Sequence, residues 1–146
     1  MDIQHEYPGE WLTAPAESDS VDNGIIFVTG RCDVDKFRNN PKFSIRVDVT
    51  YTYGGDDCSF PDKETSETIA EVTDRLVATF KKDPVAVLTG IYTGCGQRNW
   101  TFYTPSTHIF QRKFNEALAD MPTLPITMSA ENDPDWAEYA EMRSVL

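Results

Sequence analysis

The residues best suited to covalent chemistry lie in and after a turn flanked by glycines. Cys95 stands between Gly94 and Gly96, a setting that could leave its thiol exposed. Arg98 follows three residues later and would favour the thiolate, which is the nucleophilic form of cysteine. His108 is the candidate base, although the sequence does not say whether it lies near the thiol. The alternative interpretation is a tight hairpin whose glycines serve only the geometry of the turn.

Acidic residues form the second candidate set, and they gather at both ends of the chain. Residues 128–146 contain five acids and one Arg, and residues 1–22 contain six acids and neither Lys nor Arg. These ends carry −10 of a formal net charge of −11. One interpretation is a solubilising surface. The other is an acidic surface that docks on a basic partner protein, with these binding candidates: Arg98, Glu131, Asp133, Asp135, Trp136, Glu138 and Tyr139.

No metal site or cofactor is expected. The oxygen-rich runs 56–62 and 131–135 lack the spacing of a calcium-binding EF-hand loop. His5 and His108 lie far apart in the sequence, and no His/Cys cluster has the spacing of a zinc site. Gly94 and Gly96 match neither glycine-rich phosphate-binding pattern. The sequence therefore predicts no bound cofactor.

The net charge argues against nucleic acid as a partner, because a phosphate backbone would be repelled. Two features nevertheless keep a weak RNA-binding module open as an alternative. Five basic residues lie close together between 31 and 46. Aromatic residues on predicted strands also resemble a platform for stacking bases, although aromatic residues at the two-residue period of a strand are more typical of a core. These residues are Tyr51, Tyr53, Trp100, Phe102 and Tyr103.

The cellular compartment is predicted from the N-terminus, the hydropathy and the cysteines. The first residues have neither the basic nor the apolar region of a signal peptide. No run approaches the ~20 apolar residues that a membrane-spanning helix needs. Cys32, Cys58 and Cys95 are an odd number without CxxC spacing, which favours reduced thiols. We therefore expect a cytoplasmic protein with no membrane partner.

Period-two alternation and turn residues predict the strands. Residues 44–53 alternate strictly between apolar and polar side chains, which is the clearest strand signal in the chain. Asn23-Gly24 predicts a hairpin turn between arms at about 11–14 and 25–28. Other strands are expected at these ranges: 85–93, 100–104 and 126–128.

Two helices are predicted from apolar residues at helical period. The first is expected over 65–82, with Thr68 and Glu71 at capping-box spacing and Asp83-Pro84 as its stop. The second is expected to open at 105–107 and to end at Met121-Pro122.

The resulting order from residue 44 is β-α-β-β-α-β, preceded by a hairpin. Two helices with one apolar stripe each need one sheet face, so we predict an α+β two-layer sandwich with a ferredoxin-like arrangement. The first strand of such a sheet lies inside it, so the hairpin cannot simply pair beside 44–53. The length of 146 residues predicts a single domain, with a core at about 11–130 and an acidic C-terminal segment at 131–146.

Two motifs, together with the helix after the first, resemble a bacterial family, number 695 among the domains of unknown function. One motif is the hairpin from Thr89-Gly90 through Arg98 to Tyr103-Thr104. The other is the tail Asp133-Pro134-Asp135-Trp136 with Tyr139, after which the sequence departs from the family's ending. The family is similar in architecture to the ribonuclease E inhibitors, small acidic cytosolic proteins. This resemblance implies a protein-binding role, although a shared fold does not determine function.

The sequence thus favours a non-enzymatic interaction or regulatory module with an acidic docking surface. Association with a basic partner should weaken with added salt, because exposed charges are screened over ~8 Å at physiological ionic strength. The alternative is a small enzyme that uses Cys95 as the nucleophile and Arg98 to hold an anion.

Overall fold

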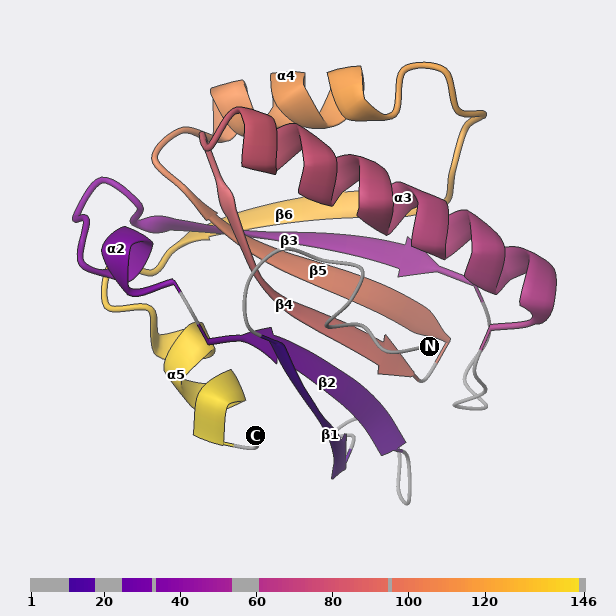
Figure 1. The fold of residues 1–146 in the computed structure, drawn as a ribbon, viewed down its shortest axis with the longest axis horizontal. Coiled ribbons are helices and arrows are strands. Elements are labelled where there is room, and N and C mark those ends of the chain that lie inside the picture. Colours follow the sequence, from indigo (N-terminus) through magenta and orange to yellow (C-terminus); the bar gives the residue numbers. More distant parts are fainter. Residues whose placement is uncertain (1–10, 18–24, 33, 54–60, 95, 145–146) are drawn as a thin grey trace.

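The computed structural model describes residues 11–17, 25–32, 34–53, 61–94 and 96–144. The turn expected at Asn23-Gly24 lies outside the described residues, as does Cys95. The expected α+β class is confirmed, because one antiparallel sheet packs against helices (Figure 1).

The sheet has six strands in the order β1-β2-β4-β5-β3-β6, and every neighbouring pair is antiparallel. The strand at 44–53 is confirmed as β3, and its alternate residues Val47, Val49 and Tyr51 are buried, as the period-two pattern predicts. The strands have these bounds: β1 Trp11–Glu17, β2 Ile25–Arg31, β3 Ile45–Thr52, β4 Val87–Gly94, β5 Gln97–Thr104 and β6 Ile126–Asn132.

The N-terminal hairpin extends the sheet beyond β4 and does not compete for β3. Strand β2 pairs with β4 from Phe27 opposite Thr93 to Gly30 opposite Gly90. Both neighbours of β3 are therefore supplied by later strands, β5 and β6. This arrangement removes the difficulty that the sequence posed for the hairpin.

Helices α3 (Lys63–Lys82) and α4 (Thr107–Ala117) lie together on one face of the sheet (Figure 1). The capping box expected at Thr68 is wrong. The helix starts earlier, because the Asp62 carboxylate accepts the backbone N–H of Thr65 at 2.8 Å and satisfies the first turn. Helix α4 begins as expected after Ser106, but it ends at Ala117, before Met121-Pro122.

The first core lies between these two helices and the sheet. Phe102 of β5 contacts Phe80 of α3 and Phe110 of α4, with ring centroids 5.2 and 4.9 Å apart. Trp100 is fully buried, and its indole N–H donates to the Thr73 hydroxyl of α3 at 2.9 Å. A buried indole N–H needs such an acceptor, so this bond sets the position of α3 over β5.

A second core lies on the opposite face of the sheet. Helix α5 (Ala137–Ser144) and the short α2 (Asp35–Arg38) cover part of that face (Figure 1). Met142 of α5 reaches Gly90 of β4 so closely that a Cβ at Gly90 would lie 2.7 Å from its sulfur. A side chain at Gly90 would therefore force Met142 to move where α5 crosses β4. The members of the second core are Val28, Val34, Phe43, Val87, Tyr103, Trp136, Tyr139 and Met142.

None of the helices in the described ranges combines the length and the apolar character needed to cross a bilayer.

The contact between Thr73 and Trp100 supplies a test of the first core. We expect Thr73→Val to lower the free energy of unfolding by about 1–3 kcal/mol, because the isosteric valine leaves a buried indole N–H without its acceptor. Urea denaturation followed by tryptophan fluorescence measures the change.

The matched control for this prediction is Thr68→Val. Thr68 lies on the same helix, donates to the Glu64 carbonyl and is half-buried. We expect that control to change stability by less than about 0.5 kcal/mol. Equal effects of the two substitutions would contradict the assigned role of the Trp100 contact.

Candidate functional site

Asp133 is the buried centre of the C-terminal segment. Its carboxylate accepts the Tyr103 hydroxyl at 2.6 Å and the backbone N–H groups of Ala137 and Glu138 at 2.9 and 3.2 Å. Burial would raise the pKa of Asp133, but these three donors together hold it below its usual value. The carboxylate therefore joins β5 to the start of α5.

Trp136 and Tyr139 are buried in the second core. The Trp136 ring stacks on Tyr103 with centroids 4.1 Å apart, and its indole N–H donates to the Phe43 carbonyl at 2.7 Å. Tyr139 meets Trp136 edge-on and donates its hydroxyl to the Arg31 carbonyl at 2.6 Å. Neither ring is available to a partner, since their exposed fractions are 1% and 2%.

Glu138 is half-buried and accepts the Tyr92 hydroxyl at 2.9 Å. Burial raises the pKa of Glu138 above its usual value, and the hydrogen bond from Tyr92 opposes that rise only in part. Burial and the neighbouring carboxylate likewise raise the pKa of Tyr92, so its hydroxyl stays protonated as the donor. This pair attaches α5 to β4.

Glu131 and Asp135 are the exposed acids among the four predicted to dock. Glu131 is the penultimate residue of β6. Its carboxylate lies 2.9 Å from the Arg46 guanidinium, which also contacts Asp48 at 2.9 Å. Burial opposes the charge on Arg46, but these carboxylates raise its pKa above the usual value. The surface that can meet a partner is therefore smaller than the acidic sequence suggests.

His108 lies far from the turn that Gly94 and Gly96 flank. His108 is exposed in the first turn of α4, which follows the C-terminal end of β5. Gly94 and Gly96 flank the turn before the other end of β5 and have φ angles of 145° and 82°. An eight-residue strand spans about 25 Å, so His108 is remote from that turn.

Arg98 is directed toward α3, beneath which it lies. Its guanidinium is 3.5 Å from the Thr73 hydroxyl and 6.0 Å from the centroid of the Trp100 ring. Four of the five aromatic residues considered as an RNA platform are buried, and Tyr53 is half-buried. Helices pack over Tyr51, Trp100 and Phe102, and Trp136 stacks on Tyr103.

Among the described residues, no strand pairs with the outer side of β6, and the sequence patterns did not predict this open edge. Strand β6 is last in the strand order, and Thr127 to Asn132 are exposed. Its seven consecutive pairs with β3 contain no bulge, and its sequence ITMSAEN has neither Lys nor Pro. Natural edge strands usually carry such features to prevent pairing with another chain. By contrast, the opposite edge strand β1 contains Pro15.

The backbone pattern shows which β6 groups face outward. At one end of the β3–β6 pairing the N–H of Asp133 donates to the Ser44 carbonyl, and at the other end the N–H of Thr52 donates to the Pro125 carbonyl. In an antiparallel pair every second residue is hydrogen-bonded to its partner, so Thr127, Ser129 and Glu131 face β3. Met128, Ala130 and Asn132 therefore direct their N–H and C=O groups away from β3.

An apolar groove of about 300 Å³ accompanies this edge. It lies between β6 and α4 and includes the 37%-exposed Met128. Its lining residues are Gln111, Phe114, Asn115, Leu118, Pro122, Leu124, Ile126 and Met128. A polar strip lies on the other side of the strand, where Thr127, Ser129 and Glu131 stand opposite residues of β3.

Together these features define an α+β protein with an open, groove-lined sheet edge. Residues 17–142 match the family of unknown function DUF695, so the chain belongs to that family, as its hairpin and tail motifs predicted. No curated protein and no solved structure matches the chain significantly.

Asp133 gives a test of the C-terminal contacts. We expect Asp133→Ala to lower the free energy of unfolding by about 3 kcal/mol, because Tyr103 and the first turn of α5 lose their common acceptor. Asp133→Asn should lower the free energy of unfolding by only about 1 kcal/mol, because an amide oxygen can still cap the helix. Urea unfolding at neutral pH measures both values.

The pH dependence separates the charge of Asp133 from its shape. A carboxyl whose pKa is lowered by folding stabilises above its unfolded pKa of about 3.9, and this contribution disappears as the pH falls through the folded pKa. Stability should therefore fall more steeply below about pH 4 in the unmodified protein than in Asp133→Asn. Glu138 is common to both proteins, so its raised pKa does not affect the comparison. The exposed control Asp135→Asn should retain the steep acid dependence, and equal slopes for all three proteins would refute the assignment.

Proposed function

We propose that this protein is a non-enzymatic protein-binding module that receives an extended, basic segment of a partner along β6. The observation that carries the proposal is the unprotected edge, with its outward backbone groups at Met128, Ala130 and Asn132. An added strand would hydrogen-bond with these groups, a common mode of peptide recognition.

The two sides of the edge favour a particular pattern in the partner. In an added strand, side chains alternate between the two sheet faces. One set would enter the apolar groove beside Phe114 and Met128, and the other would lie beside Thr127 and Glu131. The favoured segment therefore alternates apolar and basic residues.

Charge complementarity supports a partner segment over a second copy of this chain. The net charge of −11 would make two copies repel each other, whereas it attracts a basic segment. Glu131 and Asp135 supply exposed carboxylates immediately at and after the end of β6. The acidic docking surface is thus proposed around these two acids, while Asp133 and Glu138 stabilise α5.

The remaining expectations from the sequence belong to the same proposal. We propose that residues 45–132 form a ferredoxin-like unit, which the order β4-β5-β3-β6 supports. The suggested similarity to ribonuclease E inhibitors and the cytosolic location stay predictions, and both agree with a protein-binding role.

The first test is titration of the labelled protein with a short peptide in which Lys and Val alternate. We expect amide chemical shifts to change along β6 and α4, with affinity that weakens as salt is added. Ala130→Pro should abolish binding, because it removes an outward N–H and leaves the inward bonds to β3 intact. Glu131→Gln combined with Asp135→Asn should weaken binding about 3- to 10-fold.

Controls distinguish the edge from general electrostatics. Met128→Lys places a charge at the groove, whereas Ala140→Lys makes the same charge change on an exposed position of α5. Only Met128→Lys should eliminate binding, and each variant's unfolding curve verifies its fold. Unchanged binding by a folded Ala130→Pro variant would refute the proposal. A dimer that Ala130→Pro converts to monomer would instead assign the edge to a second copy of the chain.

A further inference from the structure

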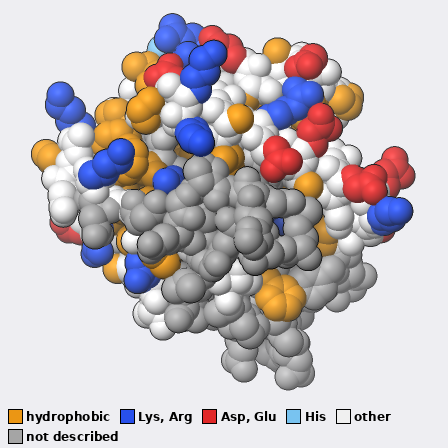
Figure 2. All heavy atoms as spheres, viewed as in Figure 1, with side chains coloured by type: hydrophobic (Ala, Val, Ile, Leu, Met, Phe, Trp, Pro, Cys, Tyr) orange, Lys and Arg blue, Asp and Glu red, His pale blue; other side chains and the backbone are white. Residues whose placement is uncertain are grey.

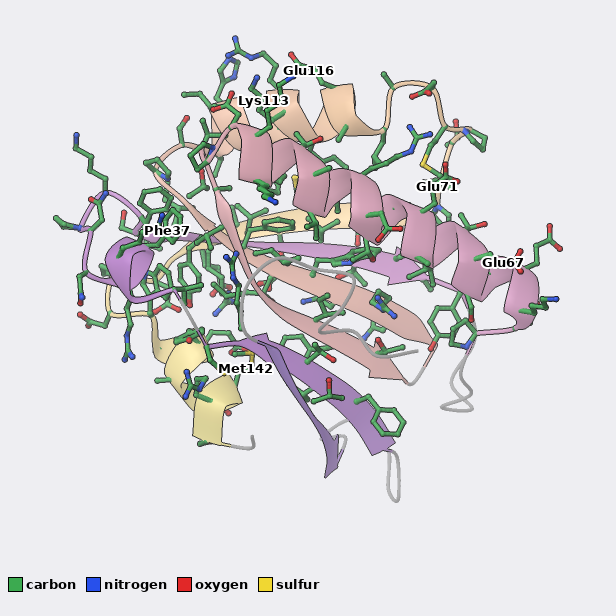
Figure 3. The ribbon with its side chains drawn as sticks, in the orientation of Figure 1. Phe37, Glu67, Glu71, Lys113, Glu116 and Met142 are labelled. Carbon is green, nitrogen blue, oxygen red and sulfur yellow. The ribbon has the colours of Figure 1, made fainter. Side chains whose placement is uncertain are left out.

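A second cavity lies where the two cores meet, at the end of the sheet away from the β4–β5 turn. Its volume is about 320 Å³, and it is bounded by the end of β2, helix α2, the last turns of α3 and the start of β4. Val77 and Phe80 come from the first core, and Phe37 and Val87 come from the second. Figure 3 shows Phe37 on α2 at this end of the molecule.

The charge of the cavity is opposite to that of the chain. Its described lining residues include Arg31, Lys36 and Lys81 and no acid, although the sequence has 24 acids and 13 bases. Figure 2 shows blue Lys and Arg side chains around a hydrophobic patch at this end, and red acids gathered at the other. The acids of the N-terminal half of α3 belong to that other end, where Figure 3 shows Glu67 and Glu71.

The acid that follows α3 does not cancel the charge of Lys36 and Lys81. Asp83, which follows α3, contacts the Lys113 ammonium of α4 at 2.9 Å, so its charge is compensated away from the cavity. Lys36 lies 5.0 Å from the centroid of the Phe37 ring. A cation beside an aromatic ring at the edge of an apolar cavity can hold an anionic group while the floor accepts a hydrocarbon body.

We propose that this cavity binds a small amphipathic anion. Lys36 and Lys81 would hold its carboxylate or phosphate, and Phe80, Val87 and Leu88 would hold its apolar body. The volume lies at the lower end of the range of small-molecule sites, so the ligand is a short acyl or aryl compound. The lysines are exposed, which allows them to meet the anion without a large cost of burying charge.

The test compares octanoate, octyl phosphate and 1-octanol as probes in chemical-shift titrations. We expect both anions to shift amides of α2, the end of α3 and the start of β4, with octanol at least about tenfold weaker. The two anions distinguish a carboxylate ligand from a phosphate ligand. Lys36→Gln combined with Lys81→Gln should weaken anion binding about tenfold and leave octanol binding unchanged.

Two further variants keep the proposal falsifiable. Lys42→Gln with Lys63→Gln removes the same charge from exposed positions outside the cavity lining and should retain anion affinity. Val77→Phe should fill the cavity from α3 and weaken all three probes, with its fold verified by its amide spectrum. The proposal would be overturned if neither anion bound saturably up to about 10 mM. It would also be overturned if octanol bound as tightly as the anions, or if the chemical-shift changes were confined to another surface.

Discussion

The second face of the sheet depends on one buried carboxylate. Asp133 accepts the hydroxyl of Tyr103 from β5 and two backbone N–H groups from α5, so it joins a central strand to the last helix. Trp136 stacks directly on Tyr103 although its φ angle of 54° is unfavourable for a bulky side chain. A backbone in this region costs about 1–3 kcal/mol, which the stack and the hydrogen bond to Phe43 offset.

This constraint changes the meaning of the acidic C-terminal segment. Acids that look equivalent in the sequence have different roles. Asp133 caps the start of α5, Glu138 attaches that helix to Tyr92, and Glu131 contacts Arg46 but stays exposed. A carboxylate that already accepts several hydrogen bonds has little capacity left for a partner. The charge available for recognition is therefore set by burial and pairing as well as by composition.

The two proposed surfaces follow from how the sheet is enclosed. Helices α3 and α4 bury one face, whereas α5 and α2 cover only part of the other, so a cavity forms where the two cores meet. The hairpin protects the β4 side of the sheet and leaves β6 open. The open edge offers hydrogen bonds with exposed acids beside it, and the cavity offers basic groups around an apolar floor.

The sequence by itself determined the elements whose signals are local. Alternation at Val47, Val49 and Tyr51 identified β3, and helical periodicity identified α3 and α4, because backbone geometry imposes these periods directly. Only the tertiary structure decided the place of the hairpin, the burial of Asp133 and the distance of His108 from the β4–β5 turn. These features depend on contacts between residues far apart in the chain, such as Trp136 with Phe43, and no local period encodes which distant groups will meet.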